Sequence, residues 1–351
     1  MVSVRIETSA PTRIDLAGGT IDIWPLYLFH DHAQTINAAI SLRARATVES
    51  RDDQRVVIRS EDTNRTAEVT DWSLLRGTHD LRLLGLLAHW FLTTPDSGNT
   101  GDGRESQHDM ARQGLTLTTR CESPAGAGIA GSSALSVAVC AALAAWTGRE
   151  CEPEALLQIA MNVEAQAINV PTGVQDYRPA MYGGIAAIEL GVAGVTRVAL
   201  DVDARELESR LVLCYTGEPR NSGTNNWEIT RRHLDGDRFI FDCFERIRDT
   251  AAAMRLALAR GDWDAVGIAI AGEWENRKRL APGVTTPVID DLMARARGAG
   301  AVAAKVCGAG GGGCLFAYGP PDAHTAIEEA LRAGGARVLP FRIETHGLTR
   351  G

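Results

Sequence analysis

The sequence has no stretch that would carry the chain into or across a membrane. No run of about 18 consecutive apolar residues occurs. The first five residues, MVSVR, do not lead into the apolar core of a signal peptide. The seven cysteines include no Cys-x-x-Cys pair and no Cys/His spacing typical of a metal site. We therefore predict a cytoplasmic protein without membrane contact, whose thiols stay reduced.

The sequence also lacks an excess of positive charge. Its 36 Lys and Arg residues are outnumbered by 44 Asp and Glu residues, which gives a net charge of −8. This balance argues against a nucleic-acid-binding surface. A phosphate site on such a chain needs local positive charge or a metal ion. The length of 351 residues, with 45% hydrophobic and 23% charged residues, is typical of a globular protein with two domains.

One stretch, Pro124–Leu135, has almost no side-chain bulk. It reads PAGAGIAGSSAL and is followed by an apolar, helix-forming segment up to Trp146. Glycines let the backbone approach a ligand closely, and the free N–H groups of a helix N-terminus favour an anion, usually phosphate. Ser132 and Ser133 could cap this helix, bind phosphate oxygen or bind a metal on the phosphate. A flexible loop before a core helix is the alternative.

Two common nucleotide motifs are missing here. No Lys-Ser/Thr pair follows the glycines as in a Walker A loop. No acidic residue stands about 20 positions further on at a strand end, as a dinucleotide fold requires, because Glu150 and Glu152 lie just past a helix. The stretch therefore predicts a nucleotide site of another kind and argues against a dinucleotide-dependent oxidoreductase.

The remaining pattern predicts strands and helices in mixed order. Strands are expected at 4–8, 35–40, 43–48, 55–60, 115–119, 184–190, 195–202, 210–217, 301–306, 315–318 and 336–343, and helices at 81–92, 153–168, 238–260, 262–277, 287–298 and 321–333. Residues 94–113 predict an exposed loop. A second glycine-rich segment, Gly308–Gly313, lies between two of the expected strands. We predict domains at 1–200 and 201–351, the second an α+β sandwich with antiparallel strands.

Three carboxylates stand at positions suited to chemistry. Asp22 follows a tight Gly-Gly turn, Asp176 lies between segments rich in Pro and Gly, and Glu164 sits among small apolar residues on an expected helix. A side chain held by a tight turn can be aimed into a cleft, although turn-forming aspartates are common. For Glu164 an exposed position is the alternative.

Three stretches carry a resemblance to a known family: Ala10–Asp22, Pro124–Ala134 and Lys305–Cys314. In this order, and spread over nearly the whole chain, they are similar to the three motifs of the GHMP small-molecule kinases (galacto-, homoserine, mevalonate and phosphomevalonate kinases). The resemblance implies an α+β, two-domain GHMP kinase fold. Its N-terminal domain would be of the ribosomal-protein-S5-domain-2-like type and its C-terminal domain a ferredoxin-like α/β sandwich.

Within this superfamily the sequence resembles in particular the D-glycero-D-manno-heptose 7-phosphate kinases and fucokinase-type sugar kinases. The residues that carry this are Leu16–Gly19, Ala130–Leu135, Gln175–Tyr177, Glu273–Glu275 with Lys278, and Gly308–Gly313. The heptose kinases usually read Ala-Gly-Gly-Gly-Thr-Asp where this chain has AGGTID at 17–22, and WP at 24–25 and HDH at 30–32 also depart from the family. These departures fall near the sugar site.

The resemblance implies transfer of the γ-phosphoryl group of ATP to a hydroxyl of a sugar or sugar phosphate, with ATP and Mg²⁺ as cofactors. The implied nucleotide-binding residues are Pro124, Gly126, Gly128, Ala130, Gly131, Ser132 and Ser133. Mg²⁺ would be held by Ser133, with Ser132 as second choice, and by Glu164. Asp176 would accept the proton of the attacking hydroxyl, and Arg13 would neutralise phosphate charge and keep Asp176 ionised. The implied sugar-binding residues are Asp22, Gly19, Thr20, Tyr182, Gly310 and Gly311.

Several alternatives stay open. The heptose comparison implies the C1 hydroxyl, whereas fucose, galactose or a non-sugar alcohol would make a different kinase. A nucleotide- or sugar-binding regulator without catalysis is the other class, which the presence of all the implied catalytic residues disfavours. Arg220, Arg277 and Lys278 are weak candidates for anchoring a second phosphate, with solvated surface charge favoured for each. Tyr182 either lines the sugar pocket or packs. The expected partner is a small-molecule sugar or sugar phosphate, with no nucleic acid or membrane, and a homodimer is left open.

Overall fold

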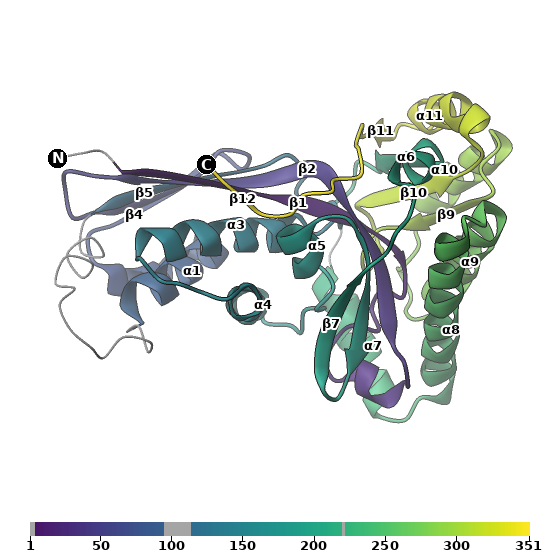
Figure 1. The fold of residues 1–351 in the computed structure, drawn as a ribbon, viewed down its shortest axis with the longest axis horizontal. Coiled ribbons are helices and arrows are strands. Elements are labelled where there is room, and N and C mark those ends of the chain that lie inside the picture. Colours follow the sequence, from purple (N-terminus) through teal and green to yellow (C-terminus); the bar gives the residue numbers. More distant parts are fainter. Residues whose placement is uncertain (1–3, 95–113, 220–221) are drawn as a thin grey trace.

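The larger of two sheets runs along the length of the molecule (Figure 1). The computed structural model describes residues 4–94, 114–219 and 222–351. In it, eight strands pair in the order β12-β1-β2-β5-β3-β4, with β6 beside β2 and β7 beside β6. Their bounds are Arg5–Ala17 (β1), Gln34–Ser50 (β2), Val56–Ser60 (β3), Arg65–Val69 (β4), Leu115–Cys121 (β5), Ile185–Gly191 (β6), Gly194–Ala199 (β7) and Thr349–Arg350 (β12). β3 and β5 pair in parallel, and the other pairs are antiparallel.

β2 corrects the expectation of two separate strands at 35–40 and 43–48. It is one strand. Its Arg43 pairs with Pro11 of β1 and its Ile40 pairs with Thr12, the next residue of β1, so the register shifts by two residues. The two residues between are a bulge, which bends a strand without ending it. One end of β2 pairs with β5 and the other with β6. This long strand therefore joins both parts of the sheet.

Helices cover one face of the larger sheet. They are α1 (Arg82–Thr93), α3 (Gly131–Trp146), α4 (Pro153–Ile168) and the short α5 (Tyr177–Tyr182) (Figure 1). Twelve of the 16 residues of α3 are buried, since it packs on β1 and β2 with α1 and α4 at its sides. The predicted helices at 81–92 and 153–168 are confirmed. The central place of α3 fixes the glycine-rich loop before it at the edge of the core.

The second sheet has four antiparallel strands in the order β11-β8-β10-β9. They are β8 (Leu211–Tyr215), β9 (Ala303–Val306), β10 (Cys314–Tyr318) and β11 (Arg337–Val338), and the helices around them are α6 (Ala204–Ser209), α7 (Ser222–Leu234), α8 (Arg238–Arg260), α9 (Trp263–Arg277), α10 (Pro287–Gly298) and α11 (His324–Ala333). The predicted antiparallel sandwich is confirmed. The strand expected at 336–343 is wrong in length, because β11 covers only Arg337–Val338. α7 was not predicted.

The two halves share part of their structure. After β11 the chain returns to the larger sheet, where Ile343 bridges Ile40 and β12 pairs with β1. One buried apolar cluster contains residues of both sheets. The division at residue 200 stays a prediction. None of the helices in the described residues is long and apolar enough to cross a membrane. The loop expected at 94–113 lies, apart from Thr94, outside the described residues.

Candidate active site

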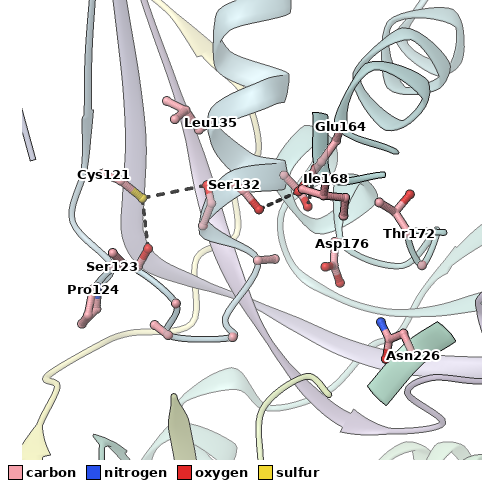
Figure 2. Close-up of a pocket in the computed structure, with 18 of the residues that line it drawn as sticks. Cys121, Ser123, Pro124, Ser132, Leu135, Glu164, Ile168, Thr172, Asp176 and Asn226 are labelled. Carbon is pink, nitrogen blue, oxygen red and sulfur yellow. Dashed lines mark hydrogen bonds between the residues drawn. The ribbon is translucent and has the colours of Figure 1, made fainter. Parts of the chain in front are cut away.

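The glycine-rich loop joins β5 to α3 and borders a cavity of about 350 Å³ (Figure 2). Gly126 and Gly128 have positive φ angles of 69° and 77°, a conformation that favours glycine. α3 begins at Gly131 without a side-chain cap, so its first N–H groups stay available to an anion. All seven residues expected to bind the nucleotide line this cavity.

The hydroxyls of Ser132 and Ser133 do not cap α3 and point instead to Glu164 of α4. Ser132 Oγ donates to Glu164 Oε1 at 2.6 Å and Ser133 Oγ to Oε2 at 3.0 Å, while the Tyr177 hydroxyl donates to Oε2 at 2.7 Å. Burial raises the pKa of Glu164, although these hydroxyl donors oppose the shift. The alternative of an exposed Glu164 is therefore wrong. The three residues expected around Mg²⁺ form one corner of the cavity.

Asp176 lines the same cavity and pairs with Arg13 of β1, although 163 residues separate the two. Arg13 itself is 1% exposed and is not among the described residues that line the cavity. Arg13 Nε donates to Asp176 Oδ1 at 3.0 Å, Nη2 donates to the same oxygen, and Nη1 donates to the Gly128 carbonyl at 3.1 Å. Burial lowers the pKa of Arg13, but the carboxylates of Asp176 and Asp15 outweigh it, so the net shift is upward. Arg13 therefore ties Asp176 to the glycine-rich loop.

The second glycine-rich segment packs against the first. A β-carbon on Gly313 would lie 2.6 Å from the Ala127 carbonyl oxygen, and the N–H of Cys314 donates to that oxygen at 2.6 Å. A β-carbon on Gly310 would lie 2.4 Å from the Val284 carbonyl, to which Gly311 N–H donates at 2.9 Å. These glycines are explained by backbone contact, and Gly310 and Gly311 are not among the described residues that line the cavity.

The turn after β1 is buried and lies away from the cavity lining. Asp22 is 1% exposed and accepts hydrogen bonds from the Gln175 backbone N–H at 3.0 Å and from its side-chain amide at 3.2 Å. A β-carbon on Gly19 would lie 2.0 Å from Asp15 Oδ2, and Thr20 is buried with a φ of 72°. None of the three is among the described residues that line the cavity, so direct sugar contact stays a prediction for them.

A buried ionic cluster lies beneath this turn. Its members are Asp15 of β1, Glu273 and Arg277 of α9, and Lys305 of β9. Arg277 also donates to the carbonyl of Gly308, and Glu273 accepts from the Gly18 N–H at 3.1 Å. Solvated surface charge, the interpretation favoured for Arg277, is therefore wrong, and its guanidinium serves this cluster. The cluster joins β1 to the second glycine-rich segment.

Two further candidates lie elsewhere. The Tyr182 hydroxyl donates to Glu154 at 2.9 Å, its ring stacks under Arg197, and it is not among the described cavity residues. The packing alternative for Tyr182 therefore fits the structure. Lys278 forms a surface ion pair with Glu275 at 2.7 Å. Arg220 lies outside the described residues.

Sequence reasoning missed some residues of the cavity. Asn226 of α7 lies across from the loop, with its amide nitrogen turned toward Asp176 in Figure 2. Its Oδ1 has no hydrogen-bond partner among the described residues. Thr172 also lines the cavity, and the Tyr177 hydroxyl donates a hydrogen bond to Glu164. The sequence around Asn226 is a polar stretch without a recognisable motif, and α7, the helix that places Asn226 at the cavity, was not predicted.

Two domains meet beside a glycine-rich loop at a helix N-terminus, and a carboxylate paired with a buried arginine lines the adjoining cavity. This is the arrangement of a small-molecule phosphotransferase. The chain belongs to the GHMP kinases. The model of the GHMP kinases N terminal domain matches residues 103–184, and that of the GHMP kinases C terminal domain matches residues 254–337. The two-domain GHMP kinase fold is thereby confirmed.

Similar proteins act on sugars and on other alcohols. The chain is 26% identical over 350 residues to a D-glycero-alpha-D-manno-heptose 7-phosphate kinase of Campylobacter jejuni. The alignment covers 98% of each of the two chains. The chain is 24% identical to an L-fucokinase/L-fucose-1-P guanylyltransferase of Bacteroides fragilis, over 92% of this chain and 35% of that protein. The chain is also 26% identical to a mevalonate kinase of Thermococcus sibiricus, in an alignment that covers 68% of this chain and 69% of that protein.

Solved structures share the fold over the whole chain. A D-glycero-D-manno-heptose 1-phosphate kinase from Bacteroides thetaiotaomicron superposes with a TM-score of 0.77 at 23% identity, covering 99% of this chain and 98% of that one. A Lactococcus lactis galactokinase in complex with galactose superposes with a TM-score of 0.75 at 19% identity, covering 98% and 95%.

Proposed function

We propose that the protein is an ATP-dependent sugar kinase, which transfers the γ-phosphoryl group to a hydroxyl of a sugar or sugar phosphate. The observation that carries this proposal is the Asp176 carboxylate, which lines the cavity bordered by the glycine-rich loop and pairs with the buried Arg13. A carboxylate beside a phosphate site is suited to accept or orient the proton of an attacking hydroxyl. Full-length similarity to a heptose 7-phosphate kinase supports the same activity.

The loop and α3 would hold the phosphates. The N–H groups at Gly131–Ser133 face the cavity at the positive end of a 16-residue helix. No bulky side chain stands between these donors and the cavity, because the loop is built from glycine and alanine. The acidic net charge of the chain is offset locally by this dipole and by Arg13.

The corner around Glu164 fits a magnesium ion. It offers one carboxylate and two hydroxyl oxygens, each hydroxyl within 3.0 Å of a carboxylate oxygen, and hard oxygen ligands are those that Mg²⁺ prefers. Within the described residues no group of three or more His, Cys, Asp or Glu side chains is arranged to hold a metal. A site shared with phosphate oxygens and water needs only this partial set. When bound, the ion would neutralise phosphate charge during transfer.

Asp176 would remove the proton as the acceptor hydroxyl attacks phosphorus. The new oxygen–phosphorus bond forms while the bond to the leaving ADP oxygen breaks, and the hydroxyl proton passes to the carboxylate. Arg13 forms an ion pair with Asp176 before the reaction, and its guanidinium would offset part of the negative charge of the transferred group. Buried donors of this kind are preorganised, so little rearrangement accompanies the step.

We further propose a heptose 7-phosphate-like acceptor, phosphorylated at C1. Similarity over 98% of both chains to the Campylobacter jejuni enzyme supports this choice. Fucose, galactose and non-sugar alcohols are the alternatives, since fucokinases, a galactokinase and mevalonate kinases are also similar. A regulator without catalysis is disfavoured, because Arg13, Glu164 and Asp176 are all present. Glu164 and Asp176 line one cavity, and Arg13 pairs with Asp176. The cytoplasm is the proposed location.

An acceptor screen tests the proposal. The purified protein is assayed for ATP consumption with Mg²⁺ and heptose 7-phosphate, free heptose, fucose, galactose or mevalonate, side by side. We expect the highest kcat/KM with heptose 7-phosphate and a product with an anomeric phosphate, identified by phosphorus NMR. The Asp176→Asn variant controls for contaminating kinases. Binding of Mg·ATP without transfer to any acceptor would contradict the enzyme proposal and favour a regulator.

A further inference from the structure

Protein encloses the Asp22 carboxylate on all sides. The residue is 1% exposed and is not among the described residues that line the cavity. Its Oδ2 accepts from the backbone N–H of Gln175 at 3.0 Å, and its Oδ1 accepts from Gln175 Nε2 at 3.2 Å. Both oxygens thus bind one residue, and that residue directly precedes Asp176.

The backbone around Asp22 is joined to the same loop. The Asp22 carbonyl accepts from the Val174 N–H at 3.3 Å, and Ile23 forms a β-bridge with Gly173. A β-carbon on Gly173 would lie 2.1 Å from Asp22 Oδ2, so only glycine lets the loop close over the carboxylate. The turn after β1 therefore fixes three consecutive residues of the loop before Asp176.

We propose that Asp22 is a positioning residue, which fixes the loop 173–175 and thereby sets the place of the Asp176 carboxylate opposite Arg13. This inference rests on the proposed function, because it assigns Asp22 a part in the same phosphoryl transfer. Arg13 holds the Asp176 side chain, whereas Asp22 holds the backbone that carries it. Asp22 therefore acts on turnover and not on acceptor binding.

The electrostatics agree with a structural contact. Burial raises the pKa of Asp22 to about 7, and the nearby Asp176 carboxylate adds to the shift. The hydrogen bond from the Gln175 backbone opposes it. Bonds to a charged acceptor are stronger than neutral ones, so Asp22 holds Gln175 more firmly when it is ionised than in the neutral form that burial favours. A displacement of about 1 Å in a catalytic group costs about 10²-fold in rate.

Three variants test this assignment. Asp22→Asn removes one of the two acceptors, and Gln175→Ala removes the side-chain donor alone. The double variant, Asp22→Asn with Gln175→Glu, reverses the pair: the new amide accepts from the backbone N–H and donates to the new carboxylate, and the total charge is unchanged. Asp31→Asn replaces another aspartate by asparagine, at an exposed position between β1 and β2, and serves as the matched control.

We expect Asp22→Asn to lower kcat by about 10²-fold while the acceptor KM changes by less than about threefold. Gln175→Ala should lower kcat by a smaller factor with the same unchanged KM, and Asp31→Asn should match the wild type. The reversed pair should recover most of kcat. Circular dichroism confirms folding, and Gln175→Ala supplies the answer if Asp22→Asn does not fold.

A rise of the acceptor KM with kcat retained would mean direct sugar contact and would overturn the proposal. So would a reversed pair as slow as Asp22→Asn. Hydrogen exchange separates this failure from failure of the kinase assignment, because it needs no acceptor. The amides at Gln175 and Asp176 should exchange faster in Asp22→Asn than in the wild type. Unchanged exchange would refute positioning even if no acceptor were phosphorylated.

Discussion

The buried cluster of Asp15, Glu273, Arg277 and Lys305 offers a direct test of how the two halves are held together. The change is Lys305→Met, which keeps the length of the side chain and removes its charge. The ammonium lies 3.4 Å from Asp15 Oδ1 and 3.4 Å from Glu273 Oε1, and all four side chains are at most 2% exposed. Water cannot take the place of the lost charge.

The expected cost follows from the charge balance of the cluster. Two positive and two negative groups become one positive and two negative, and removing one partner of a buried pair costs about 3–5 kcal/mol. Burial alone would raise the pKa of Asp15, but Lys305, Arg277 and Arg13 outweigh it and lower the pKa. Without Lys305, Asp15 therefore takes up a proton more easily, which limits the cost. We expect about 3 kcal/mol and a fall in Tm on the order of 4 °C.

Scanning calorimetry at several pH values measures this effect. The deficit of Lys305→Met should shrink as pH falls, because protonation of Asp15 relieves the excess negative charge. A double variant with Glu273→Gln restores the charge balance and should lose less than Lys305→Met. Lys278→Met, which breaks a surface pair, should change the free energy of unfolding by less than about 1 kcal/mol. An unchanged Tm in Lys305→Met, or additive losses in the double variant, would refute this account.

Asp176→Asn should fold normally and lose most phosphoryl transfer. If the variant kept the wild-type kcat at saturating substrates, Asp176 would not be the catalytic base. Glu164→Gln should raise the Mg²⁺ concentration for half-maximal rate, since a neutral amide binds a hard cation more weakly; an unchanged requirement argues against this site. Gly313→Ala places a β-carbon 2.6 Å from a phosphate-loop carbonyl and should lower Tm and raise the KM for ATP. Gly283→Ala is its control, with similar positive φ and nothing within 4 Å; equal effects would exclude the clash. The pKa of Asp22 is raised from 3.8 to about 7, so its stabilising contribution is complete below about pH 4 and lost as pH rises through about 7. Wild-type Tm should fall relative to Asp22→Asn over this window, and parallel curves would contradict the shift.

The glycine-rich loop and the helix that follows it could be predicted because the sequence pattern that indicates them is local. A run of glycine and alanine before an apolar helix former indicates close backbone approach and a helix start without any tertiary contact. The helix at Pro153–Ile168 was likewise marked by its own periodicity and its first-turn proline. β2 was predicted as two strands because the residues at 41–42 break its pattern, whereas pairing with β1 and β5 carries the strand through the bulge.

Contacts between distant parts could not be predicted from local pattern. Glu273 and Arg277 are four residues apart, which places them on one face of α9, but only the fold shows that this face is buried against Asp15. The Arg13–Asp176 pair came from the family resemblance, since 163 residues separate its members. α7 was missed because it has many polar residues, and its helix is held by packing on α8 and the segment at Leu26–Phe29.

β1 links the site to the second half of the molecule. Arg13 and Asp15 are two residues apart in this strand and so share one side. Arg13 pairs with Asp176, and Asp15 pairs with Lys305 and Arg277 from the other half. Asp15 also contributes to the raised pKa of Arg13, so the two pairs are electrostatically connected. A shift of the second half that separates Lys305 and Arg277 from Asp15 would strengthen the pull of Asp15 on Arg13 and weaken its hold on Asp176. The buried cluster is therefore a condition for the geometry of the proposed reaction as well as for the stability of the fold.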